Sequence, residues 1–222
     1  MESNLLTPSK IIYSKRKSIS LVVDTKGDFF VRAPYRCAEH RIYDFIRRKA
    51  EWIIKKRVES KAHIKYPPIQ CKNGEKLPIF GEEYIIQLVD NPRVKIIDNS
   101  LLIPNNNPKI KLISFLRRAL KKHLSIRLYE FAKAMKVEYL SISISSARTN
   151  WGSCSGKNRL HFTYRLAMCP QVVIDYIIVH ELCHILVKNH SRDFWSKVGQ
   201  YCPNYKQIEK WLKDNRYVMD II

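Results

Sequence analysis

Residues 172–190 read VVIDYIIVHELCHILVKNH, and no other stretch of the chain constrains the fold as strongly. Its first part is apolar on nearly every side of a helix, which predicts a helix that is buried all round. His180 and His184 are four residues apart, so their imidazoles project from one face of that helix and can bind a single metal ion. His190 follows six residues later and supplies a third nitrogen. The spacing therefore predicts a zinc ion held by these three histidines.

Glu181 stands next to the first of these histidines and lies about 100° around the helix from it. From there its carboxylate can reach a water molecule at the metal without being a ligand itself. Such a carboxylate can take the proton of that water, whose pKa zinc lowers to near neutrality. Three protein ligands also leave the fourth position of a tetrahedral site open, as in catalytic zinc sites. We therefore predict a zinc-dependent hydrolase with Glu181 as the general base.

The alternative is a set of histidines on a surface helix, because the HExxH pattern also occurs by chance. Two observations weigh against it. The helix is apolar on nearly every side, and a buried His-Glu-His set needs strong partners such as a metal ion. In addition, three of the seven histidines fall within residues 180–190. Cys183 faces another side of the helix, and we interpret it as a small buried apolar residue.

The spacing also matches the metzincin string HExxHxxGxxH, except that Val187 stands where that pattern has glycine. Valine does not readily adopt a positive φ. We therefore expect the helix to end later, with Asn189 in the left-handed conformation and Ser191 as the N-cap of the next helix. For this reason the chain is not assigned to the metzincins.

Outside this stretch the pattern predicts a mixture of strands and helices. A hairpin at residues 19–32, with its turn at 24–28, precedes a helix at 38–60 and a meander of antiparallel strands between residues 69 and 103. The remaining predicted elements are a long helix at 109–136, strands at 139–144 and 160–164, a helix opened by Pro170, and helices beginning at Ser191 and near residue 205.

This order of elements predicts an α+β fold. We expect an antiparallel N-terminal sheet region and a small zincin-like C-terminal core whose HExxH helix carries the site. The corresponding domains are a β-rich region with one basic helix at residues 1–104 and the hydrolase core at residues 105–222, which includes the basic helix 109–136.

The charge of the chain is strongly positive, with 40 Lys and Arg against 20 Asp and Glu. Helix 109–136 carries nine basic residues and a single acid, Glu130. Such a helix is either a solvated face or a surface that attracts polyanions, so nucleic acid or a nucleotide is a possible partner. On the second interpretation we expect reversal of Arg117, Arg118, Lys121 and Lys122 to glutamate to weaken binding of DNA or RNA.

Nothing in the sequence predicts a membrane partner. No apolar run is long enough to span a bilayer, and residues 1–17 are polar and lack the apolar segment of a secretory signal. The six cysteines are widely spaced and form no CxxC pair, which favours reduced thiols. We therefore expect a cytoplasmic protein.

Several strings resemble the YgjP-like zinc metallopeptidase family, a relative of the SprT-like and minigluzincin HExxH hydrolases. They are WGSCS at residues 151–155, YRL at 164–166, VIDYIIV at 173–179, NHS at 189–191 and FW at 194–195. The resemblance implies a zinc-dependent hydrolase acting on proteins or peptides. Some members are labelled UTP pyrophosphatases, so a metal-dependent nucleotide pyrophosphatase is one alternative. A nucleic-acid-binding module with structural zinc is another.

The chain departs from the family pattern beside the predicted site. Asn150 stands where the family has arginine, and Thr163-Tyr164 stand where it has Asn-Trp. We expect Tyr164 and Arg165 to bind substrate, by stabilising an oxyanion or by holding a carboxylate or phosphate. For Arg165 the alternative is a salt bridge with Asp175 or Asp193. Residues 160–164 are either an edge strand that pairs with a peptide substrate or an ordinary core strand.

Overall fold

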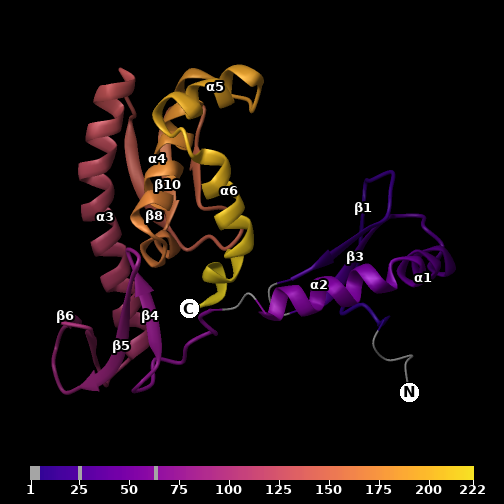
Figure 1. Cartoon of the computed structure of the whole chain (residues 1–222), viewed down its shortest axis with the longest axis horizontal. Coiled ribbons are helices and arrows are strands. Elements are labelled where there is room, and N and C mark those ends of the chain that lie inside the picture. Colours follow the sequence, from indigo (N-terminus) through magenta and orange to yellow (C-terminus); the bar gives the residue numbers. More distant parts are fainter. Residues whose placement is uncertain (1–5, 25–26, 63–64) are drawn as a thin grey trace. The chain divides into compact units, whose positions relative to one another are not determined.

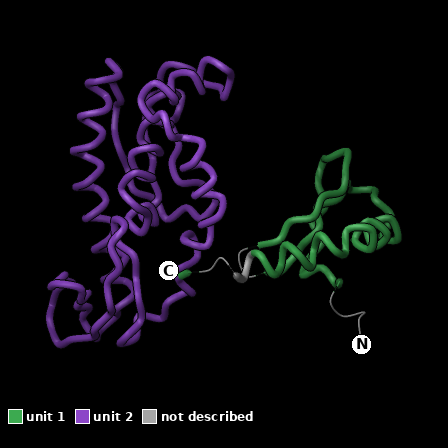
Figure 2. The backbone as a smooth tube through the Cα atoms, in the orientation of Figure 1, with its two compact units in different colours: residues 1–65 green, residues 66–222 purple. Residues whose placement is uncertain are grey.

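The computed structural model describes residues 6–24, 27–62 and 65–222. Residues 1–5 of the polar N-terminal stretch and residues 25–26 of the predicted turn therefore lie outside the description. Backbone contacts divide the chain into two compact units, residues 1–65 and 66–222 (Figure 2). The division falls at a different place from the predicted domain boundary after residue 104, because the strands between residues 76 and 104 pack against elements of the second unit.

The first unit combines a three-stranded sheet with two helices. Strands β1 (Ile11–Ser14), β2 (Ser20–Val23) and β3 (Phe29–Pro34) lie in the order β1-β3-β2. The predicted antiparallel hairpin is confirmed by the pairing of β2 with β3. Strand β1 runs parallel to β3, so the prediction of an antiparallel N-terminal sheet is wrong for this pair. The helix predicted at 38–60 is divided into α1 (Glu39–Arg48) and α2 (Ala50–Ala62), because Lys49 has a ψ of 13°. Both pieces still contribute to one core, through Ile42 and Ile46 of α1 and Ile53 of α2.

The second unit begins with a four-stranded sheet in the order β4-β5-β7-β6. Its strands are β4 (Lys76–Ile79), β5 (Glu82–Val89), β6 (Lys95–Ile97) and β7 (Ser100–Pro104). The prediction of an antiparallel meander is wrong for the central pair, because β5 and β7 run parallel. A tight turn at Asp98, with φ of 49°, folds β6 back along the far side of β7. Strand β7 therefore returns in the direction of β5.

A second three-stranded sheet follows the long helix α3 (Pro108–Met135). Its strands are β8 (Ser141–Ser145), β9 (Gly152–Cys154) and β10 (Arg159–Thr163), in the order β8-β10-β9. Strand β10 lies in the middle, parallel to β8 and antiparallel to β9. The prediction that residues 160–164 form an edge strand is therefore wrong, and the core-strand alternative holds. The two edges of this sheet belong to β8 and β9.

Helix α4 (Gln171–Leu186) lies at the centre of the second unit. The short helix η2 (Tyr164–Met168) leads into it, and α5 (Arg192–Tyr201), α6 (Tyr205–Asp214) and η3 (Arg216–Asp220) follow (Figure 1). Helix α4 contacts α3, β9, α5 and α6, which explains why it is apolar on nearly every side. Leu124 and Leu128 of α3 are among the buried residues of this unit.

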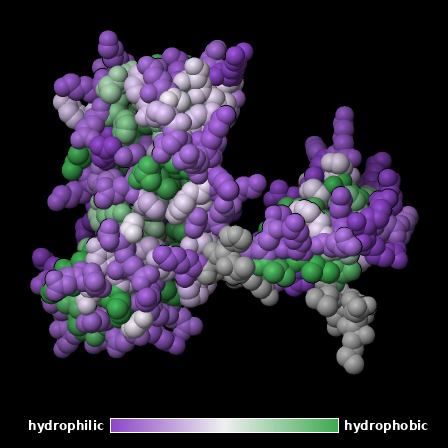
Figure 3. All heavy atoms as spheres, viewed as in Figure 1, coloured by the Kyte–Doolittle hydropathy of each residue, from purple (hydrophilic) through white to green (hydrophobic). Residues whose placement is uncertain are grey.

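These elements make the chain an α+β protein, as predicted. Hydrophilic residues cover most of the face seen in Figure 3, with smaller hydrophobic areas between them. None of the described helices combines the length and the apolar character needed to cross a bilayer.

Candidate metal centre

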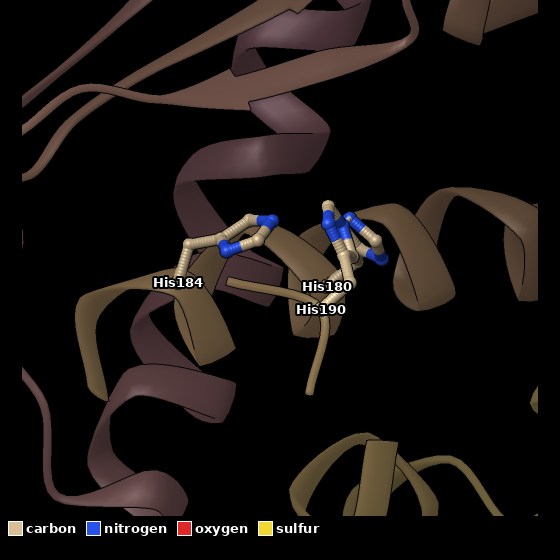
Figure 4. A group of neighbouring side chains, drawn as sticks. All are labelled: His180, His184 and His190. Atoms are coloured by element: carbon tan, nitrogen blue, oxygen red, sulfur yellow. Dashed lines mark hydrogen bonds between the residues drawn. The ribbon is translucent and has the colours of Figure 1, made fainter. Parts of the chain in front are cut away.

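The structure brings His180, His184 and His190 together (Figure 4). One ring nitrogen from each side chain lies within 4.8 Å of the corresponding atoms of the other two. The ring centroids are 5.0 Å apart for His180 and His184, 5.1 Å for His180 and His190, and 4.7 Å for His184 and His190. Three side chains are therefore close enough to share one ion.

Helix α4 and the segment after it hold these side chains in place. The helix ends at Leu186, and Val187 is extended, with φ of −134° and ψ of 112°. Asn189 does not have the left-handed conformation predicted for it. Its side-chain oxygen accepts the N–H of Ser191 at 3.2 Å, which closes a short turn before α5. Because valine is extended here, the chain leaves the helix directly and carries His190 back beside His180.

The contacts of the rings indicate which nitrogens face the shared point. His184 Nδ1 lies 3.2 Å from the carbonyl oxygen of Val187, and a proton there leaves Nε2 as the acceptor. The Nε2 atoms of His180 and His190 are 3.2 Å apart. Burial, followed by the neighbouring His184 and His190, lowers the pKa of His180 to about 3. His180 is therefore neutral at ordinary pH, which is the form that binds a metal.

Glu181 follows His180 in helix α4 and is buried, with 4% of its surface exposed. Burial raises the pKa of its carboxyl group to about 8. Its Oε2 atom has no hydrogen-bond partner among the described residues, and the same is true of His180 Nδ1. Buried polar atoms without partners are costly, and they occur mainly where a ligand or a reaction uses them.

Gly152 of β9 is a residue of this site whose role the sequence did not reveal. A Cβ atom at this position would come within 2.8 Å of Glu181 Oε1 and 2.9 Å of Glu181 Cγ. Glycine is therefore required for the Glu181 side chain to lie against the strand. A glycine inside a strand is a recognised sign of such a close approach and could have drawn attention to this position.

Two aromatic residues of α5 contact the histidine rings. In the sequence they were noticed only as part of the resemblance to the family, and no role at the site was predicted for them. Phe194 stacks on His184 with ring centroids 4.5 Å apart and meets the edge of His180 at 4.9 Å. Trp195 lies 5.8 Å from the ring of His190. Phe194 is fully buried. These contacts restrict the rotation of the rings and exclude water from one side of the cluster.

Tyr164 and Arg165 are buried in η2. Arg165 is 3% exposed and donates to the carbonyl oxygens of Met219 at 2.6 Å and Ile222 at 3.0 Å. Its guanidinium also lies over the Tyr164 ring, 4.5 Å from the centroid. The salt bridge considered for Arg165 is not formed with Asp175, which pairs with Arg127 at 2.7 Å. These contacts give Arg165 a structural role, and substrate binding by the two residues stays a prediction.

The residues present fit a divalent metal ion. Three imidazoles offer nitrogens to one point, His180 is neutral, and a buried carboxylate oxygen without a partner lies on the adjoining residue. Imidazole nitrogens are ligands that zinc accepts readily. The cluster is the one group of this kind among the residues that the structure describes.

Comparison with known proteins identifies the family of the chain. A model of the YgjP-like metallopeptidase domain matches residues 17–215. The chain is also similar to two crystal structures of metallopeptidase zymogens, each with a TM-score of 0.38. Abylysin of Pyrococcus abyssi shares 20% identity over 40% of this chain and 90% of that one, and jannalysin of Methanocaldococcus jannaschii shares 21% over 41% and 95%. No curated protein gives a match. Because the family model spans most of the sequence, the chain belongs to the YgjP-like family of metallopeptidase domains.

Proposed function

We propose that this protein is a zinc-dependent peptidase in which His180, His184 and His190 hold the ion and Glu181 is the general base. The observation that carries the proposal is the buried side chain of Glu181, whose Oε2 has no hydrogen-bond partner among the described residues and which adjoins His180, one of three converging histidines. A structural zinc site has no need of such a group.

A zinc ion bound there would lower the pKa of a coordinated water and polarise the carbonyl group of a substrate. Burial alone keeps Glu181 protonated near neutral pH, and a cation nearby favours its ionised form. The ionised Oε2 atom can then accept a proton from the attacking water and pass it to the amine nitrogen that leaves. Because Gly152 has no Cβ, it leaves the space that this carboxylate occupies beside β9.

The outer edge of β9 is the place where we expect a peptide to bind, in exchange for the hydrogen bond that Asn150 Nδ2 donates to the carbonyl oxygen of Gly152 at 3.1 Å. On the inner side of β9, the carbonyl of Trp151 accepts the N–H of Thr163 at 3.0 Å. Since backbone groups alternate along a strand, those of Gly152 and Cys154 turn to the outer edge. Gly152 is also the residue in contact with Glu181. An extended peptide added to this edge would pass beside the proposed general base.

The decisive experiment measures hydrolysis of casein and, separately, of UTP by zinc-loaded protein, with Glu181→Gln beside the wild type. We expect hydrolysis of casein that the variant lacks. Hydrolysis of UTP alone, lost in the same variant, would instead identify the nucleotide pyrophosphatase. If neither substrate is hydrolysed while zinc stays bound, the metal is structural and the proposal fails.

A further inference from the structure

The opposite edge of the same sheet forms a groove with the basic helix. Arg117, Arg118 and Lys121 of α3 line a hollow of about 350 Å³ together with residues 142–144 of β8. Strand β8 lies at one end of the order β8-β10-β9, so its outer side is not paired with another strand of this sheet. The groove therefore combines a strand edge with a row of cations.

The hydrogen bonds of β10 decide which backbone groups of β8 face this groove. The N–H of Thr163 in β10 donates to the carbonyl oxygen of Trp151, the residue before β9. Because the backbone groups of successive residues point to opposite sides of a strand, the odd-numbered residues of β10 bond toward β9 and the even-numbered ones toward β8. In a parallel pair, a residue whose N–H and C=O point toward the partner strand forms its hydrogen bonds with the two residues that flank its opposite residue. The backbone groups of the opposite residue itself point away. Because Leu160 lies opposite Ile142, the backbone groups of Ile142 and Ile144 point away from β10 and into the groove.

One of these outward-facing backbone groups, the carbonyl of Ile144, is already hydrogen-bonded to a basic side chain. Nη1 of Arg117 donates to the carbonyl oxygen of Ile144 at 2.6 Å, and Nη2 donates to Ser146 Oγ at 2.6 Å. Arg117 thus marks one end of the open edge. The N–H and C=O groups of Ile142 and the N–H of Ile144 remain directed toward the groove, in the pattern that a further strand requires.

The other two basic side chains of the groove are exposed. Arg118 and Lys121 form no ion pair with any of the described residues, whereas Arg127 on the same helix pairs with Asp175. Arg118 also lines a neighbouring hollow of about 370 Å³, to which Arg93, Lys111 and Ser114 contribute. Neither hollow has a carboxylate among its described lining residues. The groove and its continuation therefore attract negative charge.

We propose that the outer edge of β8 binds an extended acidic peptide segment as an additional strand, whose carboxylates are held by Arg118 and Lys121. Backbone pairing explains why the groove contains a strand edge, and alternate side chains of the added strand would face the cations. This binding site lies at the other edge of the sheet from β9 and does not depend on the proposed reaction.

A peptide fits these observations better than a nucleic acid does. Single-stranded nucleic acids bind where aromatic side chains offer stacking surfaces along a basic groove. The lining of the β8 groove supplies two isoleucines and a serine beside the cations, and no aromatic residue. The open N–H and C=O groups instead match the main chain of a peptide.

The test uses the full-length chain and a fluorescent peptide of alternating glutamate and valine. Binding is measured by anisotropy against Arg118→Glu/Lys121→Glu and against Lys109→Glu/Lys133→Glu. The second pair reverses two exposed cations of the same helix that do not line the groove. We expect the first pair to weaken binding about tenfold or more and the second to change it by less than about threefold.

A second probe separates strand addition from simple attraction of charge. The same peptide with N-methyl groups on alternate residues keeps its carboxylates but cannot form a ladder, and we expect it to bind about tenfold more weakly. Equal binding of the two peptides, or equal effects of the two double variants, would overturn the proposal. So would an oligothymidylate that displaces the peptide and binds more tightly through Arg118 and Lys121, because the groove would then be a nucleic-acid site.

Discussion

The two edges of the sheet β8-β10-β9 differ in how they hold their polar groups. At the β9 edge, Glu181 is buried and its Oε2 lacks a partner among the described residues. At the β8 edge, Arg118 and Lys121 are exposed to water. Burying an unpartnered polar group costs stability, whereas an exposed charge costs little. The contrast agrees with the catalytic role that we propose for the β9 edge, and we expect this edge to be sensitive to small changes in the size and polarity of single side chains. The β8 edge should be sensitive to charge and salt.

The largest effect is expected when the carboxylate of Glu181, beside β9, is removed. Glu181→Gln keeps the size of the side chain but removes the base, so hydrolysis of casein should fall by about 100- to 10,000-fold. Zinc content and the unfolding temperature should stay close to those of the wild type. Turnover that remains at the wild-type level would remove Glu181 from the reaction. Loss of both zinc and fold would assign it a structural role.

The next effect concerns the metal. Purified wild-type protein should contain about one zinc per chain, and His190→Ala should lose zinc as readily as His184→Ala during dialysis against a chelator. His161→Ala is the matched control, because His161 contacts Ser143 and lies outside the cluster. Full zinc retention in His190→Ala would show that another side chain, such as Asp193, completes the site.

A single methyl group should distinguish the β9 edge from an ordinary strand. In Gly152→Ala the new Cβ would meet Glu181 Oε1 at 2.8 Å, so the carboxylate or the strand must move. We expect a loss of stability of about 1–3 kcal/mol together with a fall in kcat. Gly156→Ala is the control, since nothing lies within 4 Å of a Cβ at that position. If both variants behave alike in unfolding and activity measurements, the close approach of Gly152 to Glu181 has no consequence.

Two buried groups predict how the metal-free protein responds to pH, and they act in opposite directions. Burial raises the pKa of Glu181 from 4.5 to about 8, so the folded chain keeps a proton that the unfolded chain releases, and stability falls as the pH rises through that range. Burial lowers the pKa of His180 from 6.5 to about 3, so the unfolded chain takes up a proton that the folded chain does not, and stability falls as the pH decreases through that range. The free energy of unfolding should therefore be greatest between about pH 4.5 and 6.5 and should decline on both sides by up to about 1.4 kcal/mol per pH unit. Urea unfolding between about pH 4 and pH 8 measures this, and a profile that is flat over the whole range would contradict it.

The smallest effect is expected at the β8 edge. Reversal of one exposed charge, as in Arg118→Glu, should change the free energy of unfolding by no more than about 0.5 kcal/mol. A large loss of stability would mean that Arg118 is part of the packing of α3, and the contrast between the two edges would fail.

The sequence predicted the local features of the site well. The spacing of His180 and His184, the buried character of α4 and the long helix α3 all follow from periodicity within one element. The sequence predicted less well where segments distant in the chain meet. Strand β10, one of whose two predicted positions was the edge of a sheet, lies in the middle of its sheet. Strands β5 and β7, predicted as part of an antiparallel meander, pair in parallel. Strand order depends on which faces pack together, and periodicity does not encode it.

The sequence by itself determined the group of side chains that we propose as the metal site, because three histidines and a glutamate within eleven residues can meet through helix geometry and one short turn. Only the tertiary structure decided what surrounds them. It placed Gly152 against Glu181 and tied Arg165 to the carbonyl groups of Met219 and Ile222. It also left one edge of the sheet beside Glu181 and the other beside Arg118. These contacts join segments that are far apart in the chain. They form only when apolar surfaces of different elements are buried against each other, and the local sequence pattern does not say which surfaces will meet.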